Sequence, residues 1–78
     1  MRDSLHIDIR LRVSQRRTEL KLTREALAGK TEPTMSSKYL WEIETGRKHL
    51  SAEMLRRIAI ALDVSSDWIL GMPNDKVR

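Results

Sequence analysis

The chain has 78 residues, 15 Lys and Arg against 11 Asp and Glu, a net charge of +4 and no cysteine. A domain this small has a core worth on the order of a few kcal/mol, so a second subunit would add stability and a deep catalytic cleft is not expected. The composition excludes disulfides and Cys-based zinc sites, and no apolar run is long enough for a membrane span or a signal peptide. We therefore expect an intracellular, cytoplasmic protein.

The positive charge is unevenly distributed along the chain. The first 24 residues hold seven basic and three acidic side chains, whereas the remainder is neutral overall. A pI near 10.0 favours a polyanionic partner such as nucleic acid. A net charge of this size is also what solubility requires, so charge alone leaves both interpretations open.

The first predicted element is a helix over residues 9–20, because Ile9, Val13, Arg17 and Leu20 recur at the spacing of one helical face. Residues 5–13, by contrast, alternate strictly between apolar and polar side chains, as a half-buried strand does. We favour the helix since its face continues through residues 14–20. Residues 1–8 stay open as a helix, a strand or an arm.

Two short helices are predicted next from their capping residues. Thr23 is a good N-cap for a helix that Gly29 ends. Ser36 is the best cap for a third helix over residues 37–45, which Gly46 ends in the left-handed conformation.

The last two helices complete an all-α chain. Ser51 caps the fourth, whose inward stripe is Leu55, Ile58, Ala59 and Leu62. Either Ser65 or Ser66 caps the fifth, which ends at Gly71 and Pro73. The expected organisation is an N-terminal extension over residues 1–8, a helical domain over residues 9–71, and a flexible tail over residues 72–78.

Two charged residues fall on inward faces. A helical wheel places Glu44 about 40° from Leu40, on the apolar side of the third helix, while Arg17 lies on the inward stripe of the first. A buried carboxylate must be paired or neutralised, so a bridge between Arg17 and Glu44 is expected. The alternative is that both side chains reach solvent.

The opposite side of the third helix is polar, with Lys38 and Glu42 facing outward. A short helix behind a tight turn, presenting polar side chains, is how a helix-turn-helix enters the major groove of DNA. The alternative is an ordinary surface pair, because Lys38 and Glu42 are four residues apart and can neutralise each other.

Three motifs in order resemble the XRE family of prokaryotic regulators, the lambdoid phage Cro and repressor type of helix-turn-helix. They are LTREALA at residues 22–28, KYLWEIETG at residues 38–46, and AIALDVS followed by DWILG within residues 59–71. The resemblance covers residues 9–71 and implies a five-helix lambda-repressor-like DNA-binding domain. It also implies a homodimer on a palindromic operator, and it places Arg17 and Glu44 at the positions of the family's internal bridge.

The resemblance also implies roles for individual residues. The base-reading positions of the family fall on Ser37, Lys38 and Glu42, with Trp41 at their margin as a further base contact, and Lys and Glu suit guanine and cytosine respectively. The phosphate-contacting positions fall on Thr23 and Arg24, at the start of the second helix, and on Arg47, Lys48 and His49 after the third. Trp68 and Ile69 are expected in the core or at the dimer interface.

Three features depart from the family pattern. The segment at residues 29–35 lengthens the connection between the second and third helices by two residues, which puts the register of base contacts in doubt. Lys21 stands where the family often has glycine, and Thr45 and Arg47 flank Gly46 in place of more usual basic and proline-containing runs.

No catalytic, metal or cofactor site is expected. The stretch at residues 29–31 lacks the first glycine of a phosphate-binding loop, and His6 and His49 lack the spacing of metal ligands. The function that the resemblance implies is a DNA-binding regulator, most simply a repressor, with double-stranded DNA as partner and without a small-molecule effector. The alternatives are an antitoxin or adaptor on the same fold, or the DNA-binding half of a sensor.

Overall fold

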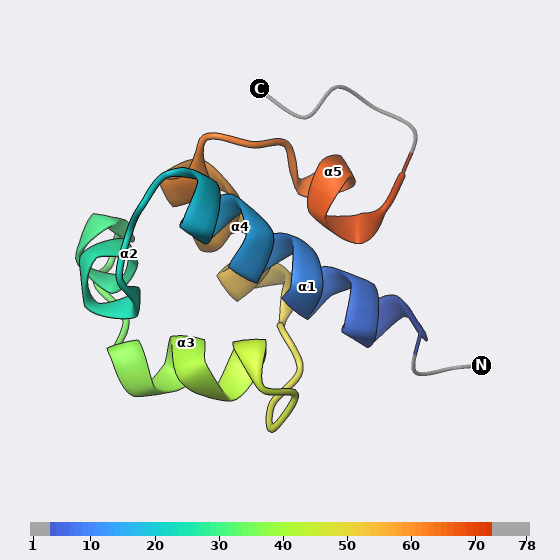
Figure 1. The fold of residues 1–78 in the computed structure, drawn as a ribbon, viewed down its shortest axis with the longest axis horizontal. Helices are drawn as coiled ribbons and strands as arrows, with labels where there is room; N and C mark the ends of the chain where they lie inside the picture. The colour runs from blue at the N-terminus through green and yellow to red at the C-terminus, as the bar shows by residue number, and fades with distance from the viewer. Residues whose placement is uncertain (1–3, 73–78) are drawn as a thin grey trace.

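The structure is a computed structural model that describes residues 4–72, with side chains from residue 8 onward. Five helices make up this part of the chain: α1 (Ser4–Glu19), α2 (Arg24–Lys30), α3 (Ser37–Glu44), α4 (Ala52–Leu62) and α5 (Ser66–Leu70). Figure 1 shows α2 and α3 on one side of α1 and α5 on the other. Among the described residues, no helix has the length and apolar character needed to cross a membrane.

Helix α1 decides between the two interpretations of the N-terminal segment. It begins at Ser4, so residues 4–8 belong to the same helix as residues 9–19 and do not form a strand. Ile9 and Val13 are buried as predicted, but Leu20 is 38% exposed and does not continue the inward face. The helix ends at Glu19, one residue before Leu20, and Lys21 then turns the chain with a left-handed φ of 59°.

The other helices begin where their caps predict. The hydroxyl oxygens of Thr23, Ser36, Ser51 and Ser65 each accept a hydrogen bond from a backbone N–H of the first turn of their helix. Ser65, and not Ser66, is therefore the cap of α5. Gly46 and Gly71 have φ values of 81° and 82°, the left-handed conformation expected after α3 and α5.

The prediction that Gly29 ends α2 is wrong, because the helix continues through Lys30. The structure ends it at Thr31, whose buried hydroxyl donates to the Ala28 carbonyl at 2.6 Å and accepts from the Met35 N–H at 2.9 Å. The Thr31 side chain thereby links the last turn of α2 to the far end of the connection at residues 31–36. Helix α3 also ends one residue early, with Thr45 as its C-cap.

The core lies where all five helices meet. Its buried members are Ile9, Val13, Leu27, Ala28, Met35, Leu40, Ile43, Ile58, Ala59, Leu62, Val64 and Ile69. Ile69 is completely buried within the single chain, so it is a core residue and cannot contact a second subunit, contrary to one of the roles predicted for it. Trp68 packs against the same core but is only partly buried. Residues 73–78 of the predicted tail at residues 72–78 lie outside the described residues.

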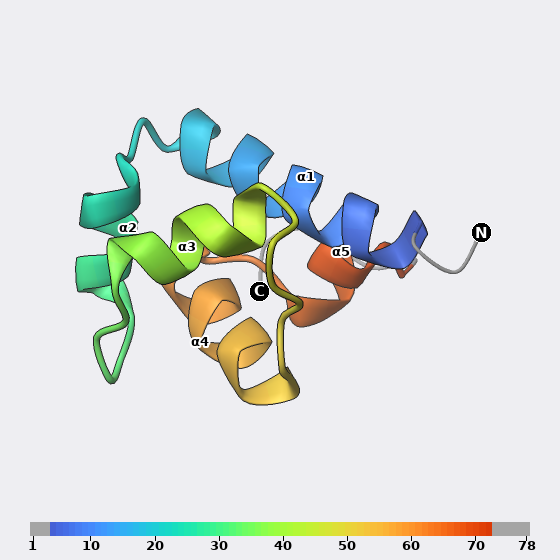
Figure 2. The same ribbon diagram turned by 90° about the horizontal axis from the view of Figure 1, so that it is seen from below.

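Helix α3 lies along the lower side of the molecule in Figure 1, and it faces the viewer in Figure 2, which is seen from below. Leu40 and Ile43 anchor it to the core, and Ser36 caps its N-terminus. The same amphipathic pattern leaves the side that carries Lys38 and Trp41 exposed. The core therefore fixes both the position of α3 and the side that it presents to solvent.

Candidate nucleic-acid interface

A buried carboxylate joins α1, α2 and α3. The side chain of Glu44 is only 2% exposed. Its Oε2 accepts from Arg17 Nε at 2.7 Å and its Oε1 accepts from Arg17 Nη2 at 3.0 Å, a bidentate pair. The ion pair that the helical wheel predicts between Arg17 and Glu44 is therefore present.

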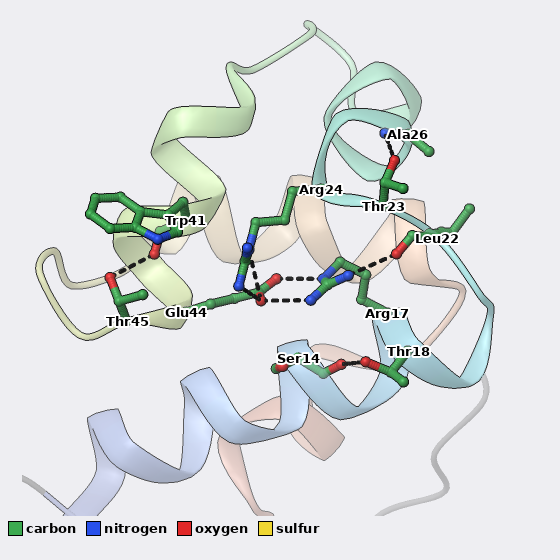
Figure 3. Close-up of polar contacts among 10 residues, drawn as sticks. All are labelled: Ser14, Arg17, Thr18, Leu22, Thr23, Arg24, Ala26, Trp41, Glu44 and Thr45. Atoms are coloured by element: carbon green, nitrogen blue, oxygen red, sulfur yellow. Dashed lines mark hydrogen bonds and ion pairs between the residues drawn. The ribbon is translucent and has the colours of Figure 1, made fainter.

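Arg24 is a third member of this cluster, which the sequence does not predict. Its Nε and Nη2 lie 3.1 Å and 3.0 Å from Glu44 Oε1. Figure 3 shows the two arginine side chains converging on the carboxylate from α1 and α2. The cluster carries two positive charges against one negative charge, so its net charge is positive. It holds the start of α2 and the end of α3 in a fixed relation.

A groove opens beside this cluster, between the N-terminal ends of α2 and α3. It has a volume of about 470 Å³ and is lined by Arg17, Thr23, Arg24, Glu25, Ser37, Lys38 and Trp41. Five of the residues singled out from the sequence as DNA contacts therefore line one concavity: Thr23, Arg24, Ser37, Lys38 and Trp41. The lining holds three cations and two hydroxyl groups against one carboxylate, that of Glu25, and such a groove suits a phosphate backbone.

Lys38 is the single basic residue of α3. It is exposed, and among the side chains of residues 8–72 no carboxylate pairs with it. The alternative of a Lys38–Glu42 surface pair is wrong, because Glu42 Oε1 instead lies 3.4 Å from Lys48 Nζ. The ammonium donors of Lys38 are therefore available to a molecule outside the chain.

The segment after α3 folds back over that helix. The guanidinium carbon of Arg47 lies 4.4 Å from the centroid of the Trp41 ring, and Lys48 Nζ lies 5.8 Å from that of Tyr39. Two residues predicted as base contacts, Trp41 and Glu42, are thus in contact with two predicted as phosphate contacts, Arg47 and Lys48. His49 follows them as an exposed residue of the same loop.

The phenol of Tyr39, on α3, has a displaced pKa. Burial raises the pKa of its phenol above the ordinary value of 10.0. The Glu42 carboxylate also raises this pKa, and the positive charge of Arg57 opposes the change. The phenol therefore stays neutral to higher pH than a free tyrosine does.

The fold and the groove together define a helix-turn-helix domain of the DNA-binding class, in which α2 and α3 form the motif and α3 carries the exposed polar side. The sequence profile of the helix-turn-helix family matches residues 13–69. The chain therefore belongs to the lambda repressor-type (XRE) helix-turn-helix family, whose members are DNA-binding regulators and generally not enzymes. The match confirms the resemblance found in the sequence and the five-helix fold class. No curated protein and no solved structure matches the chain.

Proposed function

We propose that the chain is a sequence-specific regulator, most simply a repressor, that binds a palindromic operator as a homodimer and places α3 in the major groove. The observation that carries the proposal is Lys38, which pairs with no carboxylate among the side chains of residues 8–72 and lines a groove between α2 and α3 together with two arginines. A regulator of this kind acts in the cytoplasm, where it meets its DNA.

Base reading starts at the N-terminal half of α3. Lys38 is assigned to the O6 and N7 acceptors of a guanine, and the Ser37 hydroxyl to an adjacent base edge. Trp41 and Glu42 occupy the other two positions at which the family resemblance implies base contacts. The Ser37 and Lys38 side chains line the groove, and no carboxylate of the described residues pairs with Lys38.

Phosphate contacts are assigned to two groups of residues. Thr23 and Arg24 form the first, at the start of α2, where Arg24 Nε and Nη2 bond to Glu44 and leave Nη1 for a phosphate oxygen. Arg47, Lys48 and His49 form the second, in the loop after α3. The two groups come from different segments that flank α3, and phosphate contacts from both would fix its register along the groove of the DNA.

The homodimer is supported by exposed apolar side chains. Leu11, Ile60 and Met72 are each about half exposed, at 58%, 46% and 55%. A 78-residue domain gains stability from covering such residues. Trp68, partly buried beside the core, is the interface residue retained from the sequence predictions.

Selection from randomised duplex DNA tests the proposal. The parent protein should enrich a palindrome with half-sites about one helical turn apart. Lys38→Ala should lose about 1–3 kcal/mol of preference at one base pair per half-site. Arg24→Ala should weaken binding to all sequences alike and reduce the salt slope by about 1, whereas Lys30→Ala, at the far end of α2, is the charge-matched control without effect. Equal losses on every sequence for Lys38→Ala and Arg24→Ala would contradict the assignment.

A second candidate function is an antitoxin or adaptor that acts mainly on another protein. The feature that favours it is the connection between α2 and α3 at residues 31–36, because the sequence there is longer than the family pattern. This candidate gains support if the protein binds no duplex at micromolar concentration in low salt and forms a stable complex with a protein partner.

A further inference from the structure

The turn that follows α3 is formed by a glycine in the left-handed conformation and by two backbone hydrogen bonds. Gly46 has a φ of 81°, and the guanidinium of Arg10, on α1, lies so close over it that a Cβ would clash. The backbone N–H groups of Arg47 and Lys48 both donate to the Glu42 carbonyl, at 2.8 Å and 3.2 Å. The chain is thereby turned back along the helix that it has just left.

This turn brings two cations onto the exposed side of α3. Arg47 stacks on the Trp41 ring at 4.4 Å, and Lys48 lies 3.4 Å from the Glu42 carboxylate. The stacking distance is well within the range of a favourable cation–π contact. Arg47 and Lys48 therefore each contact one of the four side chains that were expected to read bases.

Glu42 is poorly placed to read a base. Its side chain is 18% exposed, whereas that of Lys48 above it is 55% exposed. To accept a hydrogen bond from cytosine N4, the carboxylate must leave Lys48 and enter a groove flanked by phosphates of like charge. When Glu42 stays paired with Lys48, the ion pair is kept and the carboxylate does not approach the phosphates. The Lys48 ammonium then remains on the outside, where a phosphate can reach it.

Trp41 has a corresponding relation to Arg47. Trp41 as a residue is 37% exposed, and the Arg47 guanidinium lies over one face of its ring. A planar guanidinium stacked on a ring keeps its N–H donors around its edge, so it can still donate to a phosphate in two hydrogen bonds. Stacking on Trp41 already restricts the Arg47 side chain in the free protein, so less side-chain entropy is lost when Arg47 binds DNA.

We propose that Trp41 and Glu42 are positioning residues, which hold Arg47 and Lys48 for the DNA backbone, and that base reading is left to Ser37 and Lys38. This inference rests on the proposed function, because it assigns roles within the same interface. It predicts that specificity is concentrated at the N-terminal half of α3, while the C-terminal half contributes affinity that does not depend on sequence.

The first test replaces Glu42→Gln and repeats the selection from randomised duplex DNA. The base preference at every position should equal that of the parent, while Lys38→Ala, as the control, relaxes one position. Glutamine pairs well with adenine, so a base-reading Glu42 would instead shift one position toward A·T in the variant. Such a shift in an otherwise specific protein overturns the inference and leaves the proposed function intact.

The second test compares Trp41→Phe with Trp41→Leu. Leucine removes the aromatic face, so binding should weaken about two- to fivefold on all duplexes alike, whereas phenylalanine should retain most of the affinity. In an Arg47→Ala background, Trp41→Leu should have no further effect, because the residue it positions is gone. An undiminished loss in that background, or a loss confined to particular sequences, contradicts the positioning role.

A third measurement needs no DNA. Proton NMR of the free protein should show ring-current shifts of the Arg47 side-chain protons that disappear in Trp41→Leu and persist in Trp41→Phe. Unshifted Arg47 protons in the parent overturn the inference whatever the binding assays give. If the parent shows no preference for any duplex, the proposed function itself fails, and the assignment of these roles fails with it.

Discussion

Replacing Glu44→Ala removes the acceptor that joins three helices. The carboxylate accepts two of the three hydrogen bonds that Arg17 donates, and the Glu44 side chain is 2% exposed. Without it, the Arg17 guanidinium, itself only 15% exposed, keeps one hydrogen bond, from Nη1 to the Leu22 carbonyl at 2.8 Å. A charge is then left buried and largely unpaired.

The expected cost is about 3–5 kcal/mol, the range found when one partner of a buried ion pair is deleted. Arg24 adds little to this figure, because its side chain is 36% exposed and returns to water once Glu44 is gone. A domain of this size has a total stability of about 4–12 kcal/mol. The substitution should therefore remove a large part of the stability, and it should lower Tm by at least about 12 °C.

Thermal and urea unfolding followed by circular dichroism measure this loss. Arg24→Ala is the matched control and should cost only about 0.2–1 kcal/mol, because it deletes the exposed partner of the same carboxylate. The double substitution Arg17→Met with Glu44→Leu should recover most of the stability, since it removes both buried charges together. A Tm for Glu44→Ala within a few degrees of the parent would refute the reasoning.

Three further changes test other parts of the account. Lys21→Gly should raise the unfolding free energy by about 0.5–1 kcal/mol, because Lys21 has a φ of 59° at a helix C-terminus; an equal or lower stability in urea would contradict this. Thr31→Val should cost about 1–3 kcal/mol by leaving the Met35 N–H without its acceptor, while Thr31→Ser should be nearly neutral in the same assay. The pKa of Tyr39 is raised on folding, so its contribution to stability is complete below pH 10.0 and declines as pH rises through the folded value. Absorbance titration of this single tyrosine should give a midpoint above 10.0 in the folded protein, and Tyr39→Phe should remove that part of the alkaline loss.

The helix order and the caps were predictable from the sequence because their signals are local. Ser36 and Ser51 each precede an amphipathic run, and the hydroxyl that makes the cap belongs to the same few residues as the N–H it satisfies. The end of α2 was mispredicted for the opposite reason. Gly29 is a strong local stop signal, but the buried hydroxyl of Thr31 determines the end of the helix through the loop that follows.

The interface was only partly predictable. The pairing of Arg17 with Glu44 follows from two opposite charges on inward faces, which periodicity alone reveals. The contact of Arg24 with the same carboxylate depends on how α2 crosses α3, and no spacing within the sequence encodes that distance. The four-residue rule pairs Glu42 with Lys38, but the reversal at Gly46 brings Lys48 to the carboxylate instead. The fold of the chain thus gives Glu42 a partner in the following loop in place of Lys38, its neighbour on the helix.

The most direct test of the central claim is an amide NMR titration of the labelled protein with its selected duplex. If α3 enters the groove, the largest shift changes should fall on residues 23–25 and 37–49, and they should be absent with a duplex of scrambled sequence at moderate salt. Changes centred instead on α4 and the outer side of α1, with residues 37–42 unaffected, would contradict the assignment of α3 as the DNA-recognition helix.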